Sequence, residues 1–309
     1  SSMDSKRRLN VAGSMTGMTL NNRYQLIERV GIGGMAEVYR AHDTVLDRVV
    51  AVKVMLPQYA ADQTFQARFR QEAASAAKLQ SPYIVSIYDW GLDAESDTYY
   101  IVMEFLKGTD LKTAIKERGA INQRKAAEIG SQVAQALQVA HEGGIIHRDI
   151  KPENIFISDN GDYKLGDFGI ARTIERTTSG LSKKGTYSYM APEVYIGKKY
   201  GFSVDTYSLG LVLYRMLNKN RGPFLPQPPE AITFSSREQA LGRRISGEAL
   251  PRPFYGEGRL GEIVLKACAF DPKDRYSSPQ QLRQELEAIS YEAQDAALIY
   301  PNGDELQID

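Results

Sequence analysis

Apolar residues follow two different periods along this chain, and the change between them divides it into two parts. In the first part, short runs rich in β-branched and aromatic residues are broken by turn formers, which indicates strands. The predicted strands cover residues 24–30, 36–42, 48–54, 84–90 and 99–105. Between the third and the fourth, apolar residues recur from Phe65 to Ala76 at a spacing of three to four, which predicts a helix over residues 62–79.

After Gly108 the apolar residues repeat at helical spacing. Asn122 is suited to cap a long helix that ends at Gly143, and an apolar helix is predicted over residues 204–217. Between them, residues 155–157 and 163–165 flank the tight-turn sequence Asp-Asn-Gly, which predicts a hairpin.

Two later segments are less regular. Residues 220–253 are rich in proline and polar residues, which predicts an irregular insert with one short helix around residues 238–244. Ser278, Pro279 and Gln281 combine an N-cap, a first-turn proline and a capping-box glutamine, so a helix is predicted from there to about residue 291.

The predicted fold is α+β and bilobal, with a small strand-rich lobe that contains one key helix and a larger, mainly helical lobe. Residues 1–22 are expected to be a tail, in which Ser1-Ser2 before Met3 is a cloning remnant. The small lobe is expected over residues 23–104, the connector and large lobe over 105–292, and a C-terminal tail or juxtamembrane segment over 293–309. A cleft between lobes is a common ligand site.

The composition excludes some classes of function. Lys plus Arg and Asp plus Glu both number 38, so no overall charge favours nucleic acid or an anionic membrane. No apolar stretch is long enough to cross a bilayer, although a cytosolic domain cut from a membrane protein would look the same. The single cysteine, Cys268, lies in an apolar stretch and is interpreted as a buried, inert thiol in a reducing compartment.

A glycine-rich string, Gly31-Ile32-Gly33-Gly34, lies between two predicted strands. Glycines at such a turn let backbone N–H groups approach phosphate oxygens, but the string alone fits an ordinary hairpin equally well.

Lys53 lies inside an apolar strand, where its charge is costly to bury without a partner. Glu72 in the following helix is one candidate. Taken alone, however, Lys53 also fits a snorkelling surface lysine, and Glu72 a solvent-facing residue close to Arg68.

The most informative segment is HRDIKPENIF at residues 147–156, which is followed after a hairpin by Asp167-Phe168-Gly169. It places Asp149, Lys151 and Asn154 at short spacing, and Asp167 adds a second acid after the hairpin. This set suits holding a metal-bound triphosphate and orienting a hydroxyl nucleophile toward it. His147 is interpreted as a packed structural residue rather than a base.

The strings VGIGGMAEVYRA, AVKVM, RFRQEAASAAKL, IVMEFLKG, HRDIKPENIF, DFGIAR, GTYSYMAPE and DTYSLG occur in this order. With them the chain resembles the eukaryotic-like Ser/Thr protein kinases of bacteria, especially the receptor-type branch, over residues 23–291. The resemblance implies a kinase fold and transfer of the ATP γ-phosphoryl group to Ser/Thr hydroxyls of proteins, including the chain's own activation loop. Lys151 is the Ser/Thr-type signature.

The resemblance also implies roles for single residues. Asp149 accepts or orients the proton of the attacking hydroxyl, Lys151 neutralises charge on the transferred group, and Asn154 and Asp167 hold two Mg²⁺ ions, or Mn²⁺ in their place. The adenine lies against the Glu104–Leu106 connector, and Met103 gates a pocket behind it. The implied ATP-binding residues are Gly31, Ile32, Gly33, Gly34, Val38, Ala51, Lys53, Glu72, Met103, Glu104, Leu106 and Phe156.

Residues 185–193, the peptide-docking segment, are implied to receive the protein substrate. Thr186 is expected near Asp149 and Lys151, and Glu193 is expected to form a buried ion pair with Arg275. Between Gly169 and Ala191 the loop is either a flexible polar segment or an activation segment phosphorylated at Thr177, Thr178 or Ser182, with Arg148 receiving the phosphate.

Two other classes of function are disfavoured, the first because Lys53, Glu72, Asp149, Asn154 and Asp167 are all present and the second because the chain has a peptide-docking segment. A pseudokinase scaffold would bind nucleotide without transferring phosphate, and a small-molecule phosphotransferase would lack a peptide-docking segment. The expected partners are protein substrates and ATP, with self-association through the small lobe and no nucleic acid. The expected location is the cytoplasm, as a free protein or as the cytosolic domain of a single-pass membrane protein.

Overall fold

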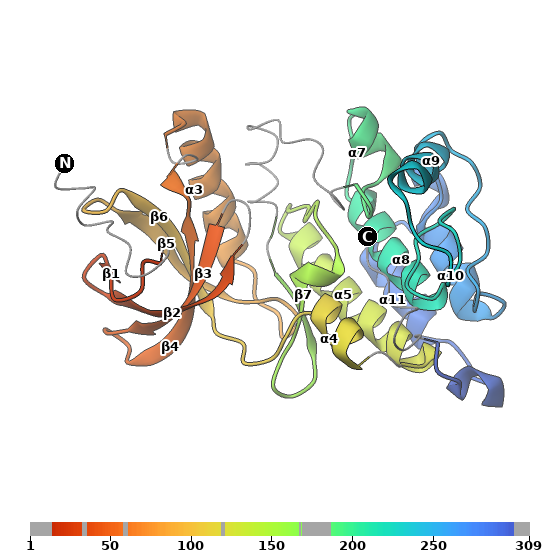
Figure 1. Cartoon of the computed structure of the whole chain (residues 1–309), viewed down its shortest axis with the longest axis horizontal. Coiled ribbons are helices and arrows are strands. Elements are labelled where there is room, and N and C mark those ends of the chain that lie inside the picture. The colour runs from red at the N-terminus through yellow and green to blue at the C-terminus, as the bar shows by residue number, and fades with distance from the viewer. Residues whose placement is uncertain are drawn as a thin grey trace. The chain divides into compact units, whose positions relative to one another are not determined.

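The structure, a computed structural model, describes residues 14–32, 36–57, 61–118, 121–166, 168 and 187–299, without the side chains of Ile32, Glu72 and Arg118. These residues form two compact units, which Figure 1 colours in sequence order. The first unit runs to Lys107 and includes Phe168, and the second begins at Gly108.

A six-stranded antiparallel sheet makes up most of the first unit (Figure 1). Its strands, in the spatial order β1-β2-β3-β4-β6-β5, are β1 (Thr19–Leu20), β2 (Tyr24–Ile32), β3 (Ala36–Asp43), β4 (Arg48–Met55), β6 (Thr98–Glu104) and β5 (Ile87–Asp93). The five predicted strands are confirmed, but β5 begins later than expected. Ile84 and Val85 are buried, but they lie in the loop before β5.

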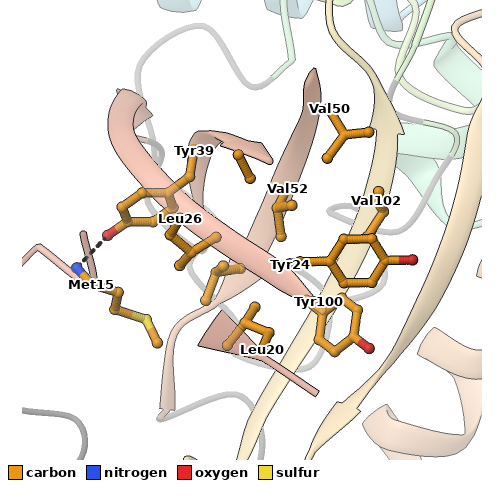
Figure 2. Packing of buried hydrophobic residues seen from close by; sticks show 11 residues of the cluster. Met15, Leu20, Tyr24, Leu26, Tyr39, Val50, Val52, Tyr100 and Val102 are labelled. Carbon is orange, nitrogen blue, oxygen red and sulfur yellow. Dashed lines mark hydrogen bonds between the residues drawn. The ribbon is translucent and has the colours of Figure 1, made fainter. Parts of the chain in front are cut away.

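One face of the sheet carries an apolar core. Alternate residues of β4, Val50, Val52 and Val54, point into it, and Figure 2 shows them with aromatic residues from the neighbouring strands. Tyr24 and Tyr100 meet edge to face there, with ring centroids 5.7 Å apart.

The opposite face packs on helix α3 (Gln63–Ala77), the helix predicted from the spacing of Phe65 and Ala76. Asp62 caps its start by accepting bonds from two backbone N–H groups of the first turn. Phe65 and Phe69 pack against Ile101 of β6, so α3 covers the face opposite to the core of Figure 2.

The segment before β2 also packs on the sheet, although the sequence analysis placed residues 1–22 in a tail. Met15 and Leu20 are buried in the core of Figure 2, and β1 pairs with the start of β2. The backbone N–H of Met15 donates to the hydroxyl of Tyr39 at 2.8 Å. Met15, Met18 and Leu20 are the only apolar residues between positions 14 and 22, too few for a period to be recognised.

Asp43, at the end of β3, is fully buried and accepts hydrogen bonds from the guanidinium of Arg23 at 2.9 and 3.0 Å. The backbone N–H groups of Val45 and Leu46 donate to the same carboxylate. These bonds, that of Arg23 first, lower the pKa of Asp43 to about 2.

We expect Asp43→Asn to destabilise the protein at neutral pH and progressively less in acid. Because the folded pKa lies below the ordinary value of about 3.9, the stabilisation by the carboxylate is complete above that value and is lost as the pH falls toward 2. Urea denaturation at several pH values between 7 and 3 measures the difference in the free energy of unfolding between the variant and the wild type. A difference independent of pH would contradict the assignment, and exposed Asp47→Asn serves as the control.

The second unit is mainly helical. Its main helices are α4 (Leu111–Arg118), α5 (Gln123–Glu142), α7 (Pro192–Ile196), α8 (Ser203–Leu217), α9 (Phe234–Ile245), α10 (Arg259–Ala267) and α11 (Pro279–Glu287). Short elements are the hairpin β7 (Ile155–Ile157) and β8 (Tyr163–Leu165) and the 3-10 turns Pro152–Asn154, Pro272–Asp274 and Ala293–Ala296. The predictions of α5, α8 and the hairpin are confirmed. Helix α8 is buried from Val204 to Leu217 and packs against α5 and α10, so the unit is built around it.

Helix α11 begins at the predicted cap but ends at Glu287 instead of near residue 291. Tyr291 lies instead against the guanidinium of Arg124 on α5, 4.4 Å from ring centroid to Cζ, which turns the chain away from the helix axis. The carboxamide of Gln281 accepts from the N–H of Ser277 rather than from that of the N-cap Ser278.

The proline-rich insert is organised around one buried cation. Arg221 is fully buried, and its guanidinium donates to the carbonyl oxygens of Pro226 and Glu230 at 2.8 and 2.9 Å. The helix expected around residues 238–244 is longer than predicted, because Thr233 and Ser236 form a capping box that starts α9 at Phe234.

Cys268, after α10, is buried, and desolvation raises the pKa of its thiol to about 12. The thiol is therefore protonated at neutral pH, as expected of an inert cysteine. None of the helices in the described residues would span a bilayer, since each is too short or too polar.

Candidate functional site

The first unit presents several of the predicted ATP-binding residues on the sheet face that α3 covers in part. Val38 pairs with Gly31 on one side and with Lys53 on the other, and Ala51 pairs with Met103. Because cross-strand partners and alternate residues of a strand share a face, Val38, Ala51, Lys53 and Met103 lie on the same one.

Gly31 leaves open space beside this row. A Cβ atom built there would lie 3.7 Å from Cβ of Val38, an ordinary contact, so packing within the sheet does not require glycine. Of the neighbouring predictions, Gly33, Gly34 and the side chains of Ile32 and Glu72 lie outside the described residues.

The connector residues after β6 are anchored through Glu104. Its backbone N–H donates to the carbonyl oxygen of Ser86, and its carboxylate accepts from the N–H of Ser86 at 2.8 Å. Glu104 is therefore held to the loop before β5 through both its backbone and its side chain.

In the second unit, the loop between α5 and β7 gathers three predicted residues around one carboxylate. The amide nitrogen of Asn154 donates to the carbonyl oxygen of Asp149 at 2.7 Å and to its Oδ2 at 3.2 Å. The Nζ atom of Lys151 lies 3.5 Å from the same Oδ2, and the Asp149 side chain keeps 15% of its surface exposed. The structure therefore brings Asp149, Lys151 and Asn154 together.

His147 holds this loop in place from inside. Its ring is fully buried, and Nδ1 accepts from the N–H of Asp149 at 3.0 Å. The proton therefore lies on Nε2, which donates to the carbonyl oxygen of Gly166 at 2.6 Å. With both ring nitrogens engaged, the interpretation of His147 as a structural residue is confirmed.

Asp205, at the start of α8, is an important residue to which the sequence analysis gave no role. Its carboxylate accepts from the N–H groups of His147 and Arg148 at 2.7 and 2.8 Å and from Nε2 of His141 at 2.8 Å. Arg148 has φ of 72°, a left-handed conformation that costs about 1–3 kcal/mol outside glycine. Asp205 thus stabilises a strained backbone directly before Asp149. An acid within an apolar helix was the available signal.

The end of the peptide-docking segment is joined to the body of the unit by the ion pair expected there. Arg275 binds Glu193 in a bidentate arrangement at 2.7 and 2.9 Å, and its side chain is fully buried. Other N–H groups of Arg275 donate to the carbonyl oxygens of Ala269 and Phe270 and to the hydroxyl of Ser203. Such a pair fixes where α7 begins.

The other predicted residues are placed less fully. Phe156 lies half-buried on β7, paired with Lys164 of β8. Asp167, Thr186 and the predicted phosphorylation sites Thr177, Thr178 and Ser182 lie outside the described residues.

Of the two predicted metal-binding residues, Asn154 lies within the described part of the chain. Among the described residues, no three His, Cys, Asp or Glu side chains gather as the ligands of a metal ion would. Asn154 nevertheless has suitable chemistry, because its amide nitrogen is engaged with Asp149 and its Oδ1 is left as a neutral oxygen donor.

Comparison with known families supports one reading of this arrangement. Residues 24–286 match the model of the protein kinase domain family. The chain is 40% identical over 280 residues to the serine/threonine-protein kinase PknB of Mycolicibacterium smegmatis, covering 88% of this chain and 43% of the relative. It is 38% identical over 275 residues to the serine/threonine-protein kinase PrkC of Bacillus subtilis, covering 88% and 41%.

Among solved structures, the kinase domain of Mycobacterium tuberculosis PknI is similar with a TM-score of 0.65 and 26% identity. That match covers 88% of this chain and 98% of the PknI domain. The chain spans about two-fifths of the length of the two curated relatives but nearly all of the solved domain.

Proposed function

Because this chain belongs to the protein kinase domain family, and within it to the serine/threonine protein kinases, we propose that it transfers the γ-phosphoryl group of ATP to serine and threonine hydroxyls of proteins. Its first unit is the strand-rich lobe and its second unit the helical lobe of the kinase fold, which confirms the predicted fold class. Residues 23–104 for the small lobe and 105–292 for the connector and large lobe remain our proposed boundaries.

The arrangement around Asp149 is the observation that carries this proposal. The carboxylate has one partly exposed edge, with Lys151 and Asn154 beside it. The backbone on its N-terminal side is stabilised in one conformation by Asp205. A carboxylate that keeps part of its surface exposed beside an amine and an amide suits contact with a substrate hydroxyl.

In the proposed reaction, one bond to phosphorus forms as another breaks. The substrate hydroxyl oxygen forms a bond to the γ-phosphorus as the bond from that phosphorus to the β,γ-bridging oxygen breaks, which releases ADP. Asp149 orients the hydroxyl and takes its proton, and Lys151 stabilises negative charge on the transferred group.

The family uses ATP with a divalent metal ion, and we propose Mg²⁺, held by Asn154 and Asp167, with Mn²⁺ as a substitute. Such an ion, when bound, neutralises charge on the phosphate oxygens. The oxygen of Asn154 is the described atom that fits this role.

We propose that the nucleotide binds at the row formed by Val38, Ala51, Lys53 and Met103 on the sheet of the first unit. Val38 and Ala51 would contact the adenine, and Met103 would limit the pocket behind it. Lys53, paired with Glu72, would bind the α- and β-phosphates, and the backbone of residues 31–34 would cover them.

We further propose that the chain phosphorylates its own activation segment at Thr177, Thr178 or Ser182. Arg148 would receive that phosphate, and its neighbour Asp149 would be positioned as a result. Thr186 would contribute to peptide docking near Asp149.

The proposed partners are protein substrates, together with a second copy of the chain. Val45, Leu46 and Val49 of the first unit are exposed and support self-association through the small lobe. The proposed location is the cytoplasm, which suits a protein whose single thiol is buried and protonated.

Intact-mass analysis tests the proposed function. Phosphatase-treated protein is incubated with ATP and Mg²⁺ beside an Asp149→Asn control, and a generic protein substrate is included. Stepwise gains of phosphate in the wild type alone are expected, with fragment maps placing them in the activation segment. If ATP binds but neither the chain nor the substrate gains phosphate, a nucleotide-binding scaffold replaces the proposal.

A further inference from the structure

Arg244, near the end of α9, is 5% exposed and lies against the described part of the peptide-docking segment. Its Nη2 donates to the carbonyl oxygen of Tyr187 at 2.7 Å, and its Nη1 donates to that of Met190 at 2.6 Å. Nη1 also lies 3.1 Å from the hydroxyl of Tyr207 on α8. One planar group therefore joins both ends of the turn from Tyr187 to Met190.

This turn depends on such side chains, because it lies outside the regular helices and strands and its carbonyl oxygens need donors. The N–H of Met190 donates to the carbonyl oxygen of Tyr187 at 3.2 Å. The hydroxyl of Ser208 on α8 donates to the backbone carbonyl oxygen of Tyr189 at 2.6 Å. Ser208 and Arg244 thus bind the backbone carbonyl oxygens of Tyr187, Tyr189 and Met190.

Helix α8 links this support to the catalytic loop. Asp205 binds the backbone before Asp149, and Ser208, one turn later on the same helix, binds the docking segment. A change in the turn from Tyr187 to Met190 would therefore alter the docking segment, whereas the backbone before Asp149 would stay bound to Asp205.

The surroundings of Arg244 would not compensate for its loss. A cavity of about 460 Å³ borders its side chain and is lined also by Tyr207, Leu250, Cys268 and Phe270. A shortened side chain would leave space there rather than be replaced by neighbours. A lysine would carry the charge but lacks the planar fork that reaches two carbonyl oxygens at once.

We propose that Arg244 is a positioning residue for the protein substrate: it shapes the backbone of Tyr187–Met190 against which the substrate peptide is laid. The proposal rests on the proposed kinase function, and Arg244 itself does not touch the reacting atoms. Its loss should weaken peptide binding and leave ATP binding and the chemical step in place.

The neighbouring residue provides a matched control. Arg243 is on the same helix and carries the same charge, but its side chain is half exposed and pairs with Glu248 at 2.6 and 2.7 Å. Exposed pairs contribute little to stability. Removing this arginine changes the charge of α9 without changing the docking segment.

Steady-state kinetics with a peptide phosphorylated by the wild type tests the proposal. Arg244→Lys and Arg244→Gln are expected to raise the KM for peptide by roughly tenfold, since two charged hydrogen bonds are weakened or lost. The KM for ATP and kcat should stay within about twofold, and Arg243→Gln should match the wild type. Thermal unfolding is recorded for each variant.

The outcomes separate the two proposals. A wild type that phosphorylates no peptide or protein removes the kinase function and this inference with it. An active wild type whose peptide KM is unchanged in both Arg244 variants overturns the inference alone. A parallel loss of kcat, ATP affinity and thermal stability also overturns it, because Arg244 would then be a general structural residue.

Discussion

Asparagine in place of Asp149 is expected to lower kcat for peptide phosphorylation by about a thousandfold, within the range found for removal of a general base. Asparagine has the same shape and can still meet the amide of Asn154 and the amine of Lys151, which lie 3.2 and 3.5 Å from the carboxylate. It cannot take the hydroxyl proton. The affinity for ATP and the unfolding temperature should therefore stay close to the wild-type values.

The measurement is peptide phosphorylation at saturating ATP, with nucleotide binding measured separately by titration. Glu153→Gln is the control, because Glu153 is a carboxylate of the same segment. Its side chain is partly exposed and lies 3.9 Å from Lys112, at the outer limit of an ion pair. It should retain nearly full activity. A similar kcat for Asp149→Asn and wild type would mean that the proton leaves by another route and that Asp149 has no part in the reaction.

Glutamine in place of Glu193 is expected to destabilise the helical lobe by about 3–5 kcal/mol, the cost of leaving one partner of a buried ion pair uncompensated. The guanidinium of Arg275 is fully buried and would keep its carbonyl contacts with Ala269 and Phe270, but the glutamine offers one neutral amide oxygen in place of the two carboxylate oxygens. Arg275→Lys should cost a similar amount, because lysine cannot bind in a bidentate manner.

Urea denaturation followed by far-UV circular dichroism measures this effect. The exposed pair of Arg259 and Glu285, 2.5 Å apart on the same lobe, provides the control, and Glu285→Gln should cost less than about 1 kcal/mol. The double variant Glu193→Leu with Arg275→Met should be more stable than either single variant, since it leaves no buried charge. Equal midpoints for Glu193→Gln and Glu285→Gln would contradict the importance of the buried pair.

Much of the fold could be predicted because its signals are periodic or local. Each of these signals can be recognised from a few neighbouring residues: the alternation of valines in β4, the spacing of Phe65 and Phe69, and the caps Asn122 and Ser278. The motifs likewise placed Asp149, Lys151 and Asn154 in one short segment, and the structure brings these residues together.

The rest depended on contacts between distant parts of the sequence. Arg221 and Arg244 lie in a polar, proline-rich stretch whose composition predicts exposure, yet both are buried against carbonyl oxygens. The role of Asp205 requires knowing that the start of α8 reaches the residues before Asp149. Nothing within a few positions of these residues carries that information.

The two ends of the described chain have a practical consequence for anyone who shortens it. The family match runs from residue 24 to 286. Met15 and Leu20, which precede the matched residues, are buried in the apolar core on one face of the sheet. Ile299, which follows them, is buried, and its N–H donates to the carbonyl oxygen of Ile121 at 2.7 Å. Expression of residues 24–286 alone would uncover apolar surface on both lobes. Such a fragment would be prone to aggregate, and its poor yield would reflect the choice of boundaries rather than a fault in the kinase fold.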